Sequence, residues 1–242
     1  DDEWKKEEIG RIGEERFRRE HECEFIIYDE TLIDPLKLVE MEGVEPKQQM
    51  GNVRWYKQPT ADNIYLVTLD PSSGTGGDNS AIQVLELPSM TQVAEWYHNK
   101  SPVEKQIKTM MEIMHYIKEQ TRQLTQIYWT VENNTIGEAA LVVIRDTGEE
   151  SFPGDFLHEP SRIQGKKGRK GYHTTHKNKM EACVQLKRLV ESNKIHLKSR
   201  ALISELKNFV SSGNSFKAKP GASDDLVMAL IIAIRMTEYI SA

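Results

Sequence analysis

Three β-rich runs follow one another in the middle of the chain with only short turns between them, and this succession restricts the possible folds more than any other feature. Residues 64–69 are almost all apolar, which favours a strand that is buried on both faces. Residues 81–87 alternate apolar and polar positions, and residues 92–97 form a third candidate strand after Pro88. Strands joined by such short turns pair antiparallel, so the sequence predicts a three-stranded meander.

A helix and another strand follow the meander. The pair Ser101-Pro102 is typical of a helix start, and the apolar residues after it keep a helical period as far as Ile117. Further periodic segments predict one strand at 126–131 and helices over about 136–145, 177–192, 200–210 and from 223–225 onward. This is the chain order of the ribonuclease H-like fold. We therefore predict an α/β fold of this class, with a central mixed β-sheet that has an antiparallel three-stranded start and is flanked by helices.

The predicted fold occupies residues 61–242, and a length of 242 residues suits one large domain with an appendage. Residues 1–24 predict a polar helix, and residues 25–60, with three scattered prolines, predict an irregular linker. We expect residues 1–60 to pack on the core as one N-terminal region. The acidic N-terminus has no signal-peptide pattern and no initiator methionine, which suggests a piece that starts inside a longer protein.

Cysteine and apolar patterns exclude several classes of protein. Cys23 and Cys183 lie far apart and outside any CxxC or CxxH spacing, so neither a disulfide framework nor a zinc site is indicated, and a reducing, intracellular setting is favoured. The longest apolar run, Leu226–Ile234, is far shorter than the roughly 20 residues that span a bilayer. No membrane span is predicted.

Acidic residues stand at three places that this topology brings together. Asp70 ends the first predicted strand, Glu132 ends the fourth, and Asp224 and Asp225 begin the last helix. Carboxylates at the carboxyl ends of neighbouring strands face one crevice, where their repulsion favours a bound cation. Oxygen ligands without a His/Cys cluster favour Mg²⁺ or Mn²⁺, and two such ions support phosphodiester hydrolysis.

Each of these acids also has a simpler interpretation. An aspartate after a strand often forms a turn, Asp224 or Asp225 can cap a helix, and Glu132 can be a solvated strand end. Asp225 carries an additional argument, because the helix after it is almost wholly apolar and must be buried, which directs its first carboxylates inward. The joint placement of the acids favours the functional interpretation.

Four segments resemble a known family. LVTLDPSSGTGGDNSAIQVL, IYWTVENNTIGEAAL and GASDDLVMALIIAIRM, at residues 66–85, 127–141 and 221–236, are similar to the three nuclease motifs of large terminase subunits of tailed bacteriophages, closest to the T4-like group. EHECEFIIYDETLI, at residues 20–33, resembles the stretch that joins the packaging ATPase to the nuclease in that family. The resemblance covers nearly the whole chain.

The resemblance implies a C-terminal nuclease domain that cuts concatemeric viral double-stranded DNA during genome packaging. It implies that Asp70, Glu132 and the pair Asp224 and Asp225 are catalytic and hold two Mg²⁺ or Mn²⁺ ions, with Asp225 favoured within the pair and Asp78 as a supporting ligand. It further implies a packaging ATPase domain in the same full-length protein, the portal and the small terminase subunit as partners, and action in the host cytoplasm, transiently at the procapsid. The chain itself has no Walker A pattern.

A basic, glycine-rich segment follows these motifs. Residues 151–200 carry 12 basic and 4 acidic side chains, although the whole chain has a formal charge of −5. Next to a nuclease site, such a segment predicts contacts to the DNA backbone, although a solvated loop is the simpler interpretation of a charge run alone. The predicted contact residues are Arg162, Lys166, Lys167, Arg169, Lys170, Lys177 and Lys179. His173 and His176 are predicted to be loop histidines, because no third ligand stands at a fixed spacing.

Three rival functions use parts of the same pattern. A RuvC-like junction resolvase would share the carboxylates and prefer branched DNA. A non-catalytic DNA-binding or assembly module would bind DNA unchanged after replacement of Asp70. An actin-like or sugar-kinase ATPase would need a second phosphate-binding turn like 72–77, and the chain shows one such turn.

Overall fold

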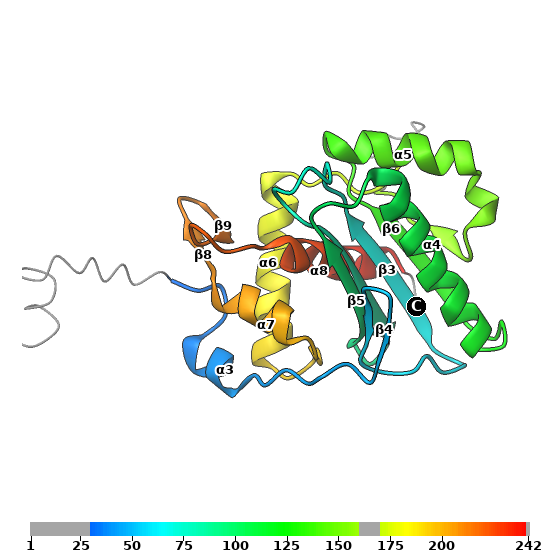
Figure 1. The fold of residues 1–242 in the computed structure, drawn as a ribbon. Coiled ribbons are helices and arrows are strands. Elements are labelled where there is room, and N and C mark those ends of the chain that lie inside the picture. The colour runs from blue at the N-terminus through cyan, green and yellow to red at the C-terminus, as the bar shows by residue number, and fades with distance from the viewer. Residues whose placement is uncertain (1–29, 160–169, 241–242) are drawn as a thin grey trace, which may run out of the picture. The chain divides into compact units, whose positions relative to one another are not determined.

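The computed structural model describes residues 30–159 and 170–240, so the predicted helix over 1–24 lies outside the described residues. The described residues form a mixed seven-stranded sheet in the order β1-β2-β5-β4-β3-β6-β7 (Figure 1). Its strands are β1 (Gln48–Met50), β2 (Val53–Trp55), β3 (Ile64–Asp70), β4 (Ser80–Leu87), β5 (Thr91–His98), β6 (Gln126–Val131) and β7 (Asp155–Phe156). A separate hairpin consists of β8 (Phe209–Ser212) and β9 (Ser215–Ala218).

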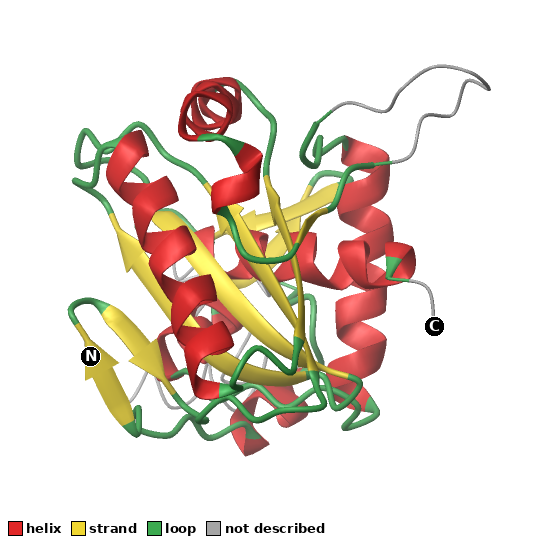
Figure 2. Ribbon diagram, turned by 90° about the vertical axis from the view of Figure 1, so that its right-hand side faces the viewer, coloured by secondary structure: helices red, strands yellow, loops and turns green. Residues whose placement is uncertain are grey.

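Helices cover both faces of the large sheet (Figures 1 and 2). They are α3 (Pro35–Glu40), α4 (Val103–Gln120), α5 (Ile136–Thr147), α6 (His176–Glu191), α7 (Arg200–Lys207) and α8 (Asp225–Met236), with 3₁₀ turns η1 (Glu149–Ser151) and η2 (Thr237–Tyr239). Among the described residues, no helix combines the length and the apolar character that crossing a membrane requires.

The predicted meander and the predicted parallel strand are both confirmed. Strands β3, β4 and β5 pair antiparallel in sequence order, and β6 pairs parallel with β3 after the crossover helix α4. The parallel register aligns Val67 with Trp129 and Leu69 with Val131. The predicted class, a mixed sheet with an antiparallel start and flanking helices, is therefore the observed one.

Two apolar layers form the core, one on each face of the sheet. Val67 and Leu69 of β3 join Met110 of α4 in one layer, whereas Leu66 joins Leu230 of α8 in the other. Alternate residues of a strand point to opposite faces, so a strand that is apolar at nearly every position serves both layers. Helix α8 is apolar all round because it packs on β3 and β4 and is covered in turn by α6 and α7.

Residues 31–60 and 200–218 differ from the sequence-based expectation. The predicted irregular linker instead contains α3 and the strands β1 and β2, and β2 extends the main sheet by pairing with β5. The predicted helix over 200–210 ends at Lys207, and the chain continues into the β8–β9 hairpin. Phe209 and Val210 are buried in β8, and Gly213 takes a positive φ of 61° in the turn between β8 and β9.

Candidate active site

Asp70 and Glu132 lie side by side at the carboxyl ends of two parallel strands. Leu69 pairs with Val131 in the register, so the next residues on each strand are Asp70 and Glu132, and the amide of Glu132 donates to the carbonyl of Leu69 at 2.9 Å. Asp70 shares its face of β3 with Thr68, whose hydroxyl donates to the carbonyl of Ala229 in α8 at 2.8 Å. The predicted juxtaposition is therefore present, on the α8 face of the sheet.

The third acidic segment enters from α8. Asp225 accepts hydrogen bonds from the backbone amide and the side-chain amide of Asn79, at 3.1 and 2.9 Å, which ties α8 to the β3–β4 loop, residues 71–79. Asp224 accepts from the amide of Ala218 at 3.0 Å. Neither carboxylate caps its own helix, so the simpler interpretation of this pair as a helix cap does not describe what these side chains do.

Glu205 of α7 caps α8 in their place. Its carboxylate accepts from the amide of Val227 at 3.0 Å, within the first turn of α8. Burial and, after it, the charges of Asp225 and Asp224 raise the pKa of Glu205 from 4.5 to about 8. The sequence does not predict this role of Glu205, because a single glutamate in an amphipathic helix does not indicate a distant partner such as Val227.

The carboxylates act on one another electrostatically. Burial raises the pKa of Asp70 well above its usual range, and the neighbouring charge and hydrogen bond of Glu132 raise it further, followed by the charges of Asp225 and Asp224. Like charges in one crevice disfavour ionisation unless a cation balances them. The four acids that the sequence singled out are therefore close enough to form one electrostatic unit.

The donor set suits a hard divalent cation, because each member offers carboxylate oxygens and Asp70 is held in an environment that favours neutralisation of its charge. Within residues 30–159 and 170–240, no group of three or more His, Cys, Asp or Glu side chains is placed closely enough to hold a metal ion. The fit to a cation therefore rests on the clustering of charge and the chemistry of the donors.

Asp78 stands apart from this group. It is exposed on the β3–β4 loop, and the charges that act on Asp70 come from Glu132, Asp225 and Asp224. Its neighbour Asn79 makes the contact to Asp225 instead. A supporting role for Asp78 in metal binding stays a prediction.

Backbone packing fixes the position of Glu132. The side-chain amide of Asn134 donates to Glu132 Oε1 at 3.0 Å. At Gly137, in the first turn of α5, an added Cβ would lie 1.9 Å from the carbonyl oxygen of Glu132, so only glycine permits this approach. Sequence analysis missed both residues, although they belong to the same motif as Glu132.

Residues on either side of 160–169 contact each other near Glu132. Tyr172 forms a parallel bridge with Glu132, and the amide of Glu159 donates to the carbonyl of Gly171 at 3.4 Å. Four of the predicted DNA contacts lie outside the described residues: Arg162, Lys166, Lys167 and Arg169.

The remaining three predicted DNA contacts have partners within the domain. Lys170 pairs with Glu149, and Lys177 lies 3.8 Å from Glu181 on the exposed start of α6. The ammonium of Lys179 lies 5.6 Å from the ring centre of Phe209. Exposed ion pairs of this kind contribute little to stability.

Both histidines near the site contact backbone carbonyl oxygens. His173 Nδ1 lies 3.1 Å from the carbonyl oxygen of Asn133, and His176 Nε2 lies 2.8 Å from that of Asn214. His176 begins α6 and does not lie in a loop.

A comparison with protein families identifies the family of this chain. A family model described as the terminase RNaseH-like domain matches residues 67–237 of this chain. The chain belongs to this family. The resemblance to terminase nuclease domains is thereby confirmed, and the narrower placement in the T4-like group stays a prediction.

Solved structures support the same fold. The large terminase nuclease of the thermophilic phage G20c with bound magnesium has a TM-score of 0.62 and 17% identity, covering 85% of this chain and 96% of that one. The Thermus phage P74-26 large terminase nuclease domain has a TM-score of 0.56 and 18% identity, covering 81% and 91%. The human cytomegalovirus terminase nuclease domain has a TM-score of 0.58 and 15% identity, covering 86% and 96%.

Proposed function

We propose that this terminase domain is a metal-dependent endonuclease that cuts concatemeric viral double-stranded DNA during genome packaging. The observation that carries the proposal is the buried Asp70, whose pKa is raised by burial and then by the charges of Glu132, Asp225 and Asp224. Membership of the terminase ribonuclease H-like family supports it.

The proposed cofactor is a pair of Mg²⁺ or Mn²⁺ ions. The G20c nuclease has been solved with magnesium, cobalt and zinc, and the cytomegalovirus domain after soaking with manganese, which supports a divalent cation here. Asp70 would hold both ions, Glu132 one and Asp225 the other, with Asp224 beside them. Such ions, when bound, lower the pKa of the attacking water and neutralise the leaving oxygen.

The protein's own part is to hold these oxygens in place before DNA arrives. Asn134 orients Glu132, and Asn79 orients Asp225. Thr68 joins β3 to α8, so Asp70 and Asp225 keep their spacing. Hydrogen bonds that fix carboxylate ligands in this way support metal affinity and activity.

The proposed substrate contact is the basic segment from Arg162 to Lys179, which includes Tyr172, the bridge partner of Glu132. Its lysines and arginines would bind phosphates without reading bases, which predicts binding that weakens steeply with salt. The packaging ATPase of the same full-length protein, the portal and the small terminase subunit are the proposed partners, and the host cytoplasm, transiently at the procapsid, is the proposed place of action.

Cleavage of supercoiled plasmid tests the proposal. The purified chain should nick and linearise the plasmid with Mg²⁺ or Mn²⁺, and a chelator or Asp70→Asn should abolish both products. Asp62→Asn is the matched control, because it removes an exposed carboxylate just before β3, at the opposite end of that strand from Asp70. Cleavage that persists in Asp70→Asn, or DNA binding without cleavage under any metal, would contradict the proposal.

A comparison of substrates then separates a terminase nuclease from a junction resolvase. Linear duplex and four-way junctions of equal length should be cut at similar rates. A strong preference for the junction would identify a resolvase with the same carboxylates.

A further inference from the structure

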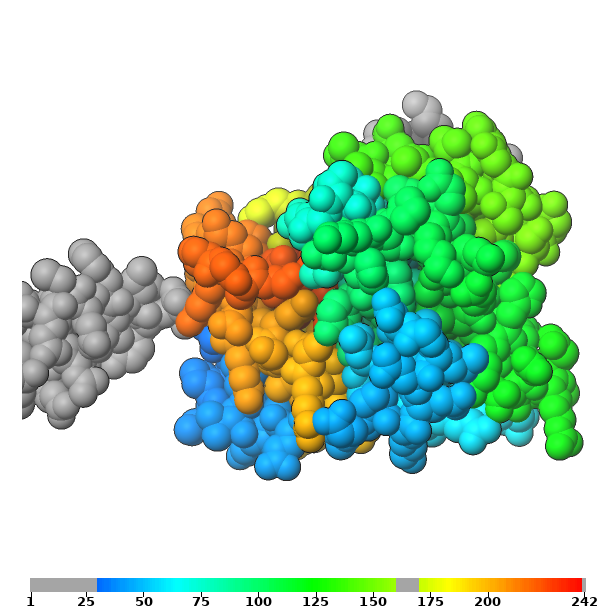
Figure 3. Space-filling view, viewed as in Figure 1, coloured from blue at the N-terminus to red at the C-terminus, as the bar shows by residue number. Residues whose placement is uncertain are grey.

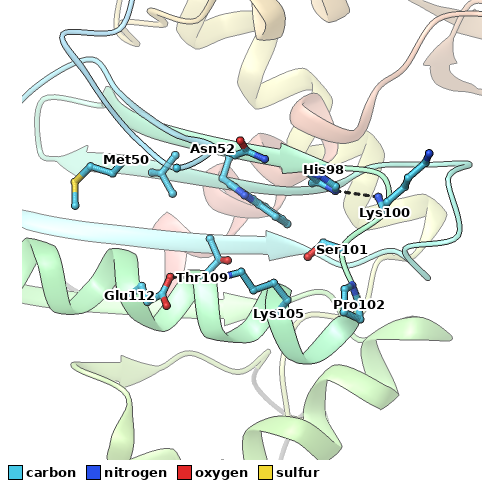
Figure 4. A pocket seen from close by; sticks show the side chains of 12 residues that line it. Met50, Asn52, His98, Lys100, Ser101, Pro102, Lys105, Thr109 and Glu112 are labelled. Atoms are coloured by element: carbon cyan, nitrogen blue, oxygen red, sulfur yellow. Dashed lines mark hydrogen bonds and ion pairs between the residues drawn. The ribbon is translucent and has the colours of Figure 1, made fainter.

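A hollow lined by both apolar and polar side chains lies on the other face of the sheet, at the beginning of α4. It has a volume of about 410 Å³ and lies between the β1–β2 hairpin, the end of β5 and the first turns of α4. Figure 4 shows Asn52 and His98 facing Lys105 and Thr109 across it, with Ser101 at one end. The hairpin is held against α4 by Trp55 and Tyr116, whose ring centres are 4.6 Å apart.

Ser101 has a buried hydroxyl that lacks a partner. The residue is 6% exposed, lines the hollow, and its Oγ makes no hydrogen bond within the described part of the chain. A buried hydroxyl without a partner costs about 1–3 kcal/mol. A ligand that accepts a hydrogen bond would remove this cost.

The N-terminus of α4 opens at the same place. This helix has 18 residues, and Pro102 at its N-cap provides no side-chain cap for the first amides. Uncapped amides and the positive end of the helix dipole favour an anion. Ser101 and Pro102 line the hollow, whereas Val103 and Glu104, whose amides begin the helix, do not. The helix end therefore contributes its positive dipole and no direct ligand.

The charged residues around the hollow are mostly basic. Lys100 and Lys105 line it, and Glu112 is the acid at its far end, 3.9 Å from the ammonium of Lys105. His98 Nδ1 accepts from the amide of Lys100 at 3.0 Å, which leaves Nε2 as the nitrogen available to donate. Hydroxyl, imidazole and ammonium donors together suit a phosphate oxygen.

The hollow lies at the same edge of the sheet as Asp70. Asp70 pairs with Ala81 on β4, and the preceding residue Ser80 pairs with His98 at the end of β5. Two strand spacings, about 10 Å within the sheet, separate β3 from β5. At a rise of 3.4 Å per nucleotide along the helix axis, this corresponds to about three nucleotides as a minimum, because the hollow lies on the α4 face and Asp70 on the α8 face.

The β3–β4 loop, which follows Asp70, is hydrogen-bonded to the chain that forms the hollow. Gln106 of α4 donates to the carbonyls of Ser72 and Ser101, each at 2.7 Å, and the amide of Gly76 donates to the carbonyl of Asn99 at 2.8 Å. Figure 3 shows this loop, in cyan, against the start of α4, in green. The loop that follows Asp70 is therefore seated on the chain that forms the hollow.

We propose that this hollow binds a backbone phosphate of the DNA, three or more nucleotides from the bond that is cut. Ser101 and His98 bind the phosphate oxygens, and Lys100, Lys105 and the positive end of α4 balance the charge. Asp70 faces α8 and the hollow faces α4. DNA that contacts both Asp70 and the hollow therefore crosses the edge of the sheet. The choice of DNA as the source of the phosphate rests on the proposed function.

Lys105→Gln and Lys108→Gln provide a matched pair for the test. Both lysines are exposed on α4 and lie 3.9 Å from Glu112, but only Lys105 lines the hollow. In an Asp70→Asn background with Mg²⁺, binding of a 30-base-pair duplex is measured over a range of salt concentrations. Lys105→Gln should reduce the slope of log affinity against log salt by about 0.9, and Lys108→Gln should leave it unchanged. Equal slopes for the two variants would overturn the proposal.

Inorganic phosphate provides a second readout that does not depend on DNA. Titration of the wild-type chain should shift the NMR signals of the Ser101 and Lys105 amides, and Ser101→Ala should weaken this binding about tenfold. Signals that do not respond, in a folded sample, would overturn the proposal.

Plasmid cleavage by the wild-type chain separates this inference from the proposed function. Cleavage with equal slopes for the two lysine variants refutes the phosphate site alone. If Lys105→Gln reduces the salt slope of DNA binding but the wild-type chain cleaves no plasmid, the proposed nuclease function is refuted and the phosphate site is supported.

Discussion

The replacement Glu205→Gln should stabilise the metal-free domain at high pH and leave it nearly unchanged at pH 5. Glutamine keeps an oxygen that can accept from the amide of Val227, but it carries no charge beside Asp224 and Asp225. A carboxyl whose folded-state pKa is raised contributes most to stability below its unfolded pKa, and that contribution is lost as the pH rises through the folded pKa. The contribution of Glu205 to stability is therefore lost as the pH rises from 4.5 to about 8.

The size of the effect follows from the same shift. At 1.36 kcal/mol per pH unit, a rise from 4.5 to about 8 amounts to about 5 kcal/mol of unfolding free energy as an upper limit. Partial exposure of Glu205 and readjustment of the two aspartates reduce this value, so we expect the variant to gain about 2–4 kcal/mol over the wild type at pH 9.

Urea unfolding with a chelator at pH 5 and pH 9 measures this difference. Glu191→Gln is the control, because Glu191 is exposed and its pKa is lowered, chiefly by a hydrogen bond from Lys187. The control should gain no stability as the pH rises. A Glu205→Gln difference that is the same at both pH values would refute the reasoning.

Three further outcomes test the assembly of the site. Thr68→Val removes the hydrogen bond to the α8 carbonyl and should lower the unfolding free energy by about 1 kcal/mol in urea denaturation, with intact secondary structure by circular dichroism. Gly137→Ala places a Cβ 1.9 Å from the carbonyl oxygen of Glu132 and should reduce plasmid cleavage more than tenfold, whereas Gly77→Ala, in open space, should cut normally. Mg²⁺ should raise the melting temperature of the wild type but not of Asp70→Asn, and an equal rise in both would place the ion elsewhere.

Strong local patterns explain what the sequence predicts well. Strand β3 is apolar on both faces, so its burial and its central place follow from the order of its residues alone, and Asp70 at its end inherits a defined position. The almost wholly apolar α8 likewise must be buried, which places Asp225 at the core boundary. These acids are predictable because a strong local pattern ends or begins at each of them.

Weak local patterns explain what the sequence does not predict. Strands β1 and β2 have three residues each, too few to show an alternation, and they become strands because β2 pairs with β5. The contacts of Asn79 to Asp225 and of Glu205 to Val227 join segments that are distant in the chain. Their polar side chains would serve equally well on a solvated surface, so only the folded arrangement reveals their role.

The order of the acidic segments along the chain also matters while the protein is being made. Asp70 and Glu132 leave the ribosome long before α8, and the crevice receives Asp225 only when that helix packs on β3 and β4. A nascent chain that has not reached α8 holds an incomplete set of carboxylates. Synthesis from the N-terminus therefore delays the complete set of carboxylates until α8 closes the hydrophobic core.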